Sequence, residues 1–245
     1  MNTSPLLVEE TNLSDAWCKV LDHIIKSPGI EITPLVLTLT GFDEIAKIRE
    51  VLDSDLKRNK CFSIRTVSET IFPESLYQFC EQDRHCLYEE YLNNLNRLKK
   101  IEPLNNRGTY FERLIAFDGK NKKINQLEII ITSLQSKTVK RRSKLQASIF
   151  DPDKDHTTMA YQGFPCLQHV TFYVTSDGGL ILNSFYAIQY VYKKAYGNWL
   201  GLINLGKFIA NELGLKFERF ICYVGVEHLD DITKTGAKKI LEMTK

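Results

Sequence analysis

The sequence predicts an α+β fold, with a large mixed or antiparallel sheet and helices packed against it. Two apolar runs, residues 170–174 and 180–192, flank the turn-forming residues 176–179, which is a strong signal for a β-hairpin. The apolar run 199–213 then has the periodicity of a helix, and Gly214 ends it. Long paired strands followed by a helix of this kind are typical of the α+β class.

The first half of the chain adds three predicted helices and one strand. Ser14 is a candidate cap for an amphipathic helix that ends near residue 26. Residues 30–39 are rich in β-branched side chains and predict a strand, and residues 43–56 predict a second amphipathic helix. A long helix is expected over 75–100, whereas residues 62–72 give no clear pattern.

The second half contains shorter elements around the hairpin. We expect a short helix at 125–134, a strand at 144–150, a polar loop at 151–163, a strand at 217–226 and a closing helix at 232–243. No stretch has the composition of a linker and no repeat is present, so residues 1–245 are predicted to form a single domain.

Composition excludes several classes of protein. The chain has 245 residues, of which 43% are apolar and 25% charged, as is ordinary for a soluble globular protein. A net charge of +2 and a pI near 8.1 do not predict a nucleic-acid partner. No apolar run of about 18 residues is present and the first residues lack the features of a signal peptide, so we expect no membrane partner and a cytoplasmic location.

The six cysteines show no metal-binding pattern. None of them forms a CxxC pair, and the two at 80 and 86 have no matching second pair. A zinc site is therefore not expected, and no metal is predicted. Reduced cysteines in the cytoplasm are the simplest interpretation.

Two motifs in the second half carry the chemistry. Pro165-Cys166 stands at the start of an apolar strand, where a cysteine can be held as a nucleophile. Gly197-Asn198 opens the helix at 199–213, where the asparagine amide can bond the edge of a flat heterocycle. The alternatives are a small buried strand residue for the cysteine and a helix N-cap for the asparagine.

In this order and spacing the motifs resemble the thymidylate synthase superfamily over roughly residues 107–230. Other segments similar to the family are Tyr110, Asn125-Gln126, Arg141-Arg142, Gly179-Leu180, Tyr186 and the run 225–229. Trp17 and the turn at 29–34 are closest in style to the pyrimidine nucleotide hydroxymethylases and phage base-modifying relatives. The resemblance implies a thymidylate synthase-like fold, a homodimer and 5,10-methylenetetrahydrofolate as cofactor.

The resemblance also implies a reaction. The Cys166 thiolate adds to C6 of a pyrimidine nucleotide, and C5 then accepts a methyl or hydroxymethyl group. Asn198 binds the base edge, which leaves both uracil and cytosine open. His228 bonds the sugar hydroxyl, and Gln168 lies on the strand after the cysteine among the substrate-binding candidates. Glu69 is the candidate acid–base carboxylate, with an exposed surface glutamate as the alternative.

Arg141 and Arg142 resemble a pair that a family member lends to its partner's nucleotide phosphate. The guanidinium fork suits phosphate because it is planar, bidentate and always charged. The two arginines also belong to the basic run 137–144, and a run of this kind is commonly a solvated face.

The sequence departs from the family at the positions that bind anions and folate. No arginine lies between residues 143 and 218, and residues 191–194 contain no aspartate of the kind that bonds the pterin. Leu167 replaces a histidine after the cysteine, and Asp230 replaces a tyrosine. An alternative function is therefore a non-catalytic nucleotide-binding or scaffold protein with the same fold, and a third is an unrelated α+β protein.

Overall fold

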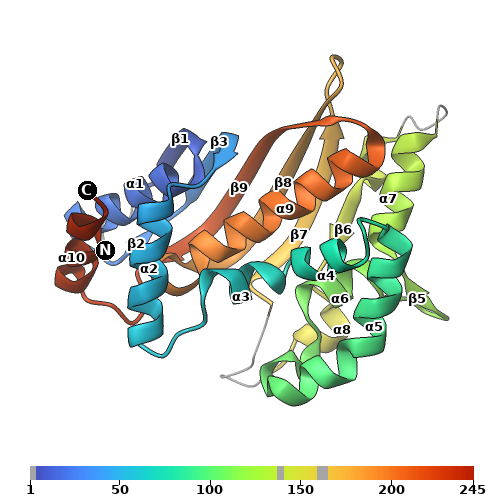
Figure 1. Ribbon diagram of the computed structural model, residues 1–245, viewed down its shortest axis with the longest axis horizontal. Coiled ribbons are helices and arrows are strands. Elements are labelled where there is room, and N and C mark those ends of the chain that lie inside the picture. The colour runs from blue at the N-terminus through green and yellow to red at the C-terminus, as the bar shows by residue number, and fades with distance from the viewer. Residues whose placement is uncertain (1–3, 137–140, 159–164) are drawn as a thin grey trace.

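The computed structural model describes residues 4–136, 141–158 and 165–245, and its architecture is mixed α+β, as predicted (Figure 1). The strands are β1 (Leu6–Asn12), β2 (Glu31–Ile32), β3 (Leu35–Asp43), β4 (Phe117–Asp118), β5 (Lys123–Ile124), β6 (Gln146–Ser148), β7 (Leu167–Val174), β8 (Gly179–Tyr190) and β9 (Lys216–His228). The helices are α1 (Leu13–Lys26), α2 (Ala46–Arg58), α3 (Ile64–Glu69), α4 (Glu74–Phe79), α5 (Arg84–Ile101), α6 (Tyr110–Ile115), α7 (Gln126–Gln135), α8 (Pro152–Asp155), α9 (Tyr196–Leu213) and α10 (Lys234–Thr244). Two 3-10 turns, η1 (Pro103–Arg107) and η2 (Arg142–Lys144), and one π-helical turn, η3 (Val191–Ala195), complete the described elements.

The main sheet has seven strands in the order β1-β3-β9-β8-β7-β6, with β2 pairing to β9 beside β3. The pairs β1–β3 and β8–β9 are parallel, and the other pairs of this sheet are antiparallel. The sheet is therefore mixed, within the predicted fold class. Figure 1 shows α9 lying across β8 and β9, while α1, α2 and α10 gather at the end of the molecule where both termini lie.

The hairpin and the long apolar helix form as the sequence predicts. β7 and β8 pair in antiparallel register from Leu167 opposite Tyr186 to Val174 opposite Leu180. Gly178 has a φ of 88° in the turn, which glycine adopts without a Cβ clash. Gly214 ends α9 in the left-handed conformation, with a φ of 63°. The unit β8–η3–α9–β9 is thus a crossover between two parallel neighbours.

The predicted helix over 75–100 is two helices, α4 and α5. Glu81 and Gln82 have positive φ values of 51° and 62°, so the chain reverses between the two helices. This turn brings the Cα atoms of Cys80 and Cys86 to 5.7 Å, and the structure joins the two residues in a disulfide. The expectation that all cysteines are reduced is therefore wrong for this pair.

The first helix begins with a different cap from the predicted one. Asn12 is the N-cap of α1, and its side chain accepts hydrogen bonds from the backbone N–H groups of Ser14 and Asp15. The Ser14 hydroxyl is buried instead and lies 2.7 Å from the hydroxyl of Tyr196 at the start of α9. Ser14 therefore ties α1 to α9 across the core.

Close backbone packing fixes α9 against α3. A Cβ on Gly197 would lie 2.6 Å from the side chain of Val67, and a Cβ on Gly201 would lie 2.7 Å from the backbone oxygen of Ser68. Both distances are too short for a real contact, so glycine is required at these positions for the helices to approach as they do. No helix in the described ranges is long and apolar enough to cross a membrane.

Candidate functional site

Cys166 lies where three strand ends meet. It directly precedes β7, and its carbonyl oxygen accepts a hydrogen bond of 3.0 Å from the N–H of Ala187 near the end of β8. Because β8 and β9 are parallel, the carboxyl end of β9 lies at the same edge. Ligands of open sheets commonly bind beyond the carboxyl ends of parallel strands, near a crossover such as η3 and α9.

Gln168 holds the segment that carries the cysteine. Its side-chain N–H₂ group donates to the carbonyl of Pro165 at 2.7 Å and to that of Cys166 at 3.3 Å. Its backbone carbonyl accepts from the N–H groups of Ile149 and Phe150 at 2.8 and 3.0 Å. The amide predicted to bind substrate is thus engaged with the backbone, and its role in this structure is to position Cys166.

Lys194 is the cation whose charge acts on the Cys166 thiol. Burial raises the pKa of the Cys166 thiol, and the positive charge of Lys194 opposes that rise. Burial also lowers the pKa of the Lys194 ammonium, and the interaction with Cys166 opposes that fall. The Lys194 ammonium lies 5.0 Å from the centre of the Phe62 ring, within the range of a cation–π contact. Lys194 is therefore the residue through which this site can favour a thiolate.

A partly buried tyrosine, Tyr110, and a buried one, Tyr186, interact electrostatically with the thiol. The phenol of Tyr110, at the start of α6, is hydrogen-bonded to the backbone of Leu167 and Cys166. Burial raises the pKa of Tyr110, and it raises the pKa of Tyr186 on β8 well above its ordinary value. Both phenols are therefore neutral at physiological pH, and the Tyr186 hydroxyl makes no hydrogen bond within the described ranges.

Asn198 is not a helix cap. η3 runs directly into α9, so Asn198 is the third residue of a helix that has already begun. Asn198 is only 5% exposed, so its carboxamide lies mostly in the interior of the protein. An amide in this position could bond a ligand, as the predicted contact with a base edge requires.

A histidine lies at the end of β9, and next to it one lysine is paired with two aspartates. The Nδ1 atom of His228 accepts a hydrogen bond of 2.8 Å from the backbone N–H of Asp230, which leaves Nε2 as a donor in the neutral ring. Lys193 forms ion pairs with Asp230, at 3.3 Å, and with Asp231. The charge of Lys193 is thus already compensated within the chain.

The sequence analysis missed a second polar pair at this edge. Gln189 on β8 and Glu227 on β9 are direct partners in the parallel register. They are 1% and 0% exposed, and none of their side-chain nitrogen and oxygen atoms has a hydrogen-bond partner in the part of the chain that is described. Burial raises the pKa of Glu227 well above its ordinary value of 4.5, because the interior of the protein favours the neutral acid over the carboxylate.

Leaving such groups unsatisfied is costly. A buried polar group without a partner destabilises a fold by about 1–3 kcal/mol. Gln189 and Glu227 also adjoin the thiol site, since Tyr186 interacts electrostatically with both Cys166 and Glu227. The signal in the sequence was one polar residue near the end of each of two apolar strands. The alternation of apolar and polar residues does not by itself show that these two residues are partners in the sheet.

Glu69 is used for local structure. Its carboxylate accepts from the backbone N–H of Ser75 at 3.1 Å and from the Ser75 hydroxyl, and it faces Arg65 at 3.8 Å. It thereby caps the first turn of α4. None of these contacts links Glu69 to Cys166.

Arg141 and Arg142 lie on the surface beside β6. The Arg141 Nε group donates to the Ser143 hydroxyl at 3.0 Å, and the Arg142 guanidinium lies 4.9 Å from the centre of the Tyr173 ring. Both side chains are exposed, and their contacts with other described residues do not reach the Cys166 edge. A role at this edge of the same chain is therefore not supported, while a role toward a second copy remains a proposal.

No known protein family model matches the chain, and no curated protein is similar enough to count as a relative. Within the described ranges, no group of three or more His, Cys, Asp or Glu side chains is arranged to hold a metal ion.

Proposed function

We propose that this chain is a thymidylate synthase-like protein that transfers a one-carbon unit to C5 of a pyrimidine, with Cys166 as the nucleophile. The observation that carries the proposal is the electrostatic interaction of Cys166 with Lys194 at the carboxyl ends of two parallel strands. Lys194 lies four residues before Asn198 in the chain. This chemistry needs a nucleophile, a cation that stabilises its ionised form, and an amide that can bond the base. Cys166, Lys194 and Asn198 are the residues proposed for these roles.

The chain's own residues account for the first half of the reaction. The Cys166 sulfur forms a bond to C6, and the electron pair of the C5=C6 bond moves to C5, where conjugation through C4 delocalises it. Asn198 would bond the N3 and C4 edge of the ring and hold C6 against the sulfur. When C5 takes a proton from water and loses its original one, departure of the sulfur restores the double bond.

The stretch expected to hold a folate donor is engaged in contacts within the chain. 5,10-methylenetetrahydrofolate is the donor that the resemblance implies. Val191, which lies in the stretch that lacks the pterin-binding aspartate, is buried, and its carbonyl accepts the Trp17 indole N–H at 2.9 Å. Tyr192 donates to Asp55 at 2.7 Å. These residues do not offer the carboxylate contact to the pterin that the family has, and we therefore assign no folate contact.

A second candidate function is binding without turnover. Two observations favour it: burial raises the pKa of the Cys166 thiol, which disfavours the thiolate, and the charge of Lys193 is compensated by two aspartates. A nucleotide sensor or scaffold with this fold needs the amide of Asn198 but no reactive thiolate.

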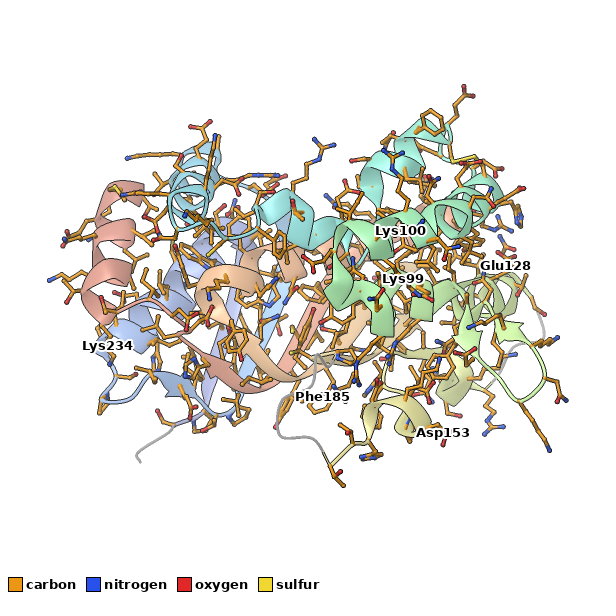
Figure 2. The ribbon with its side chains drawn as sticks, turned by 90° about the horizontal axis from the view of Figure 1, so that it is seen from below. Lys99, Lys100, Glu128, Asp153, Phe185 and Lys234 are labelled. Atoms are coloured by element: carbon orange, nitrogen blue, oxygen red, sulfur yellow. A yellow bond between two sulfur atoms is a disulfide. The ribbon has the colours of Figure 1, made fainter. Side chains whose placement is uncertain are left out.

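We also propose that the protein is a homodimer, formed through the face of the sheet opposite the helices. Figure 2 shows Phe185 on the underside of the sheet, away from the helices above it. Its ring lies 5.5 Å from that of Tyr223 and 5.9 Å from that of His169, on the two neighbouring strands. Tyr223 is 43% exposed, so the row is a partly open aromatic surface of a kind that interfaces use.

The test is release of tritium from C5. The purified chain is incubated with 5-tritiated uracil and cytosine nucleosides and nucleotides, with and without 5,10-methylenetetrahydrofolate. We expect release from at least one compound, its loss in Cys166→Ser and its retention in Cys61→Ser. Cys61 is the matched control because it too interacts electrostatically with Lys194.

Each outcome separates the two functions. Release that depends on Cys166 establishes addition to C6, and a further increase with folate establishes the donor. Binding of a compound without any release, in wild type and Cys61→Ser alike, would favour the sensor or scaffold function instead.

A further inference from the structure

We infer that Gln189 and Glu227 bind an uncharged part of the ligand, and that the ligand is an unphosphorylated pyrimidine nucleoside or base rather than its 5′-monophosphate. The inference takes the pyrimidine from the proposed function and adds the class of substrate. It stands on the position, burial and missing partners of two side chains that the proposed mechanism does not use.

Geometry links the pair to the candidate site. Gln189 and Glu227 are direct partners on β8 and β9, three residues beyond Tyr186 and Val224, which are also direct partners. Tyr186 interacts electrostatically with both Cys166 and Glu227. The pair therefore lies at the same strand ends as the thiol, and the Tyr186 hydroxyl has no hydrogen-bond partner among the described residues.

The charges at this edge do not suit a phosphate. The sequence has no arginine between residues 143 and 218. Lys193 is held by Asp230 and Asp231, and Lys194 is engaged with Cys166 and the Phe62 ring. A dianionic phosphate in a buried site requires positive charge or several N–H donors.

The unpartnered groups instead match a neutral polar ligand. No cation among the described residues pairs with Glu227 to hold it as a carboxylate, and burial is the cause of its raised pKa. In its neutral form it offers one O–H donor and one carbonyl acceptor, and the Gln189 carboxamide offers donors and an acceptor as well. Hydroxyl and amide groups of a nucleoside or base satisfy the donors and acceptors of both side chains, whereas a dianionic phosphate has only acceptors and leaves the acceptor oxygens of both without a partner.

Calorimetric titration of the full chain at pH 7 tests the inference. The probes are deoxyuridine, uridine, deoxycytidine and cytidine, each beside its 5′-monophosphate. We expect at least one nucleoside to bind tenfold or more tightly than its monophosphate. Gln189→Leu should weaken that binding tenfold or more, and Glu227→Gln, which keeps size and hydrogen bonding, should change it less than threefold. Glu218→Gln on the same strand is the control, and it should leave binding unchanged.

Four results would each overturn the inference. The first is a monophosphate that binds as tightly as its nucleoside or more so, and the second is a Gln189→Leu variant that folds and binds like wild type. Absence of binding by all four nucleosides also overturns it. Tritium release from a monophosphate but not from a nucleoside would refute this inference and leave the proposed transfer reaction intact.

Discussion

The buried carboxyl group of Glu227 should make the protein less stable as the pH rises, and Glu227→Gln should remove that dependence. Burial raises the pKa of Glu227 in the folded chain above the ordinary value of 4.5 that it regains on unfolding. Between these two values the folded state holds one more proton than the unfolded state, so stability falls with increasing pH.

The expected magnitude follows from proton linkage. Each pH unit between 4.5 and the raised pKa of the folded state removes about 1.4 kcal/mol of unfolding free energy. For a chain of 245 residues, each such unit lowers the melting temperature by about 3–6 °C relative to the variant. Tyr186 and Cys222, which interact electrostatically with Glu227, remain neutral here because burial raises the pKa of both groups.

Urea unfolding of wild type and Glu227→Gln at pH 5, 6 and 7 measures the effect. All other titrating groups are common to the two proteins, so the difference between their unfolding free energies isolates Glu227. That difference should grow in favour of the variant as the pH rises. A difference that stays constant across the three pH values would refute the reasoning, because it would mean that Glu227 is ionised in the folded protein.

Three further outcomes follow from other parts of the structure. Lys194→Met should slow alkylation of Cys166 by iodoacetamide at pH 8 by about three- to tenfold, while Lys194→Arg should not, as peptide mapping would show. Maleimide should label four cysteines of the unfolded, unreduced chain and all six after reduction, and labelling of six before reduction would contradict the disulfide. Loss of the Cys80–Cys86 disulfide should lower the free energy of unfolding by about 2 kcal/mol. Phe185→Glu should weaken the proposed dimer by at least about tenfold in sedimentation, and an unchanged dimer would exclude this face.

Local signals were sufficient where one residue type decides the conformation. The turn at 176–179 and the end of α9 at Gly214 were predicted because glycine adopts backbone angles that other residues avoid. The break between α4 and α5 was not predicted, since it depends on positive φ values at Glu81 and Gln82, two residues with no strong preference for them.

The sequence singled out Cys166 and Asn198 as candidate site residues. In the structure Cys166 is partly buried and Asn198 is buried, and Asn198 lies inside a continuous helix because the π-helical turn precedes it. Gln189 and Glu227 were missed because strict alternation along a strand would assign them to the face opposite Tyr186 and Val224, which is expected to be solvated, whereas the structure buries both. Their burial depends on the whole fold around the strand ends.

The glycines at 197 and 201 have a consequence for protein engineering. They let α9 touch α3, and they flank Asn198 on the same helix. A larger side chain at either position would force α9 to rotate or slide, which would re-aim the amide without altering it. A library that varies position 198 to change base preference should therefore keep Gly197 and Gly201, so that the position of the helix stays the same for each new side chain.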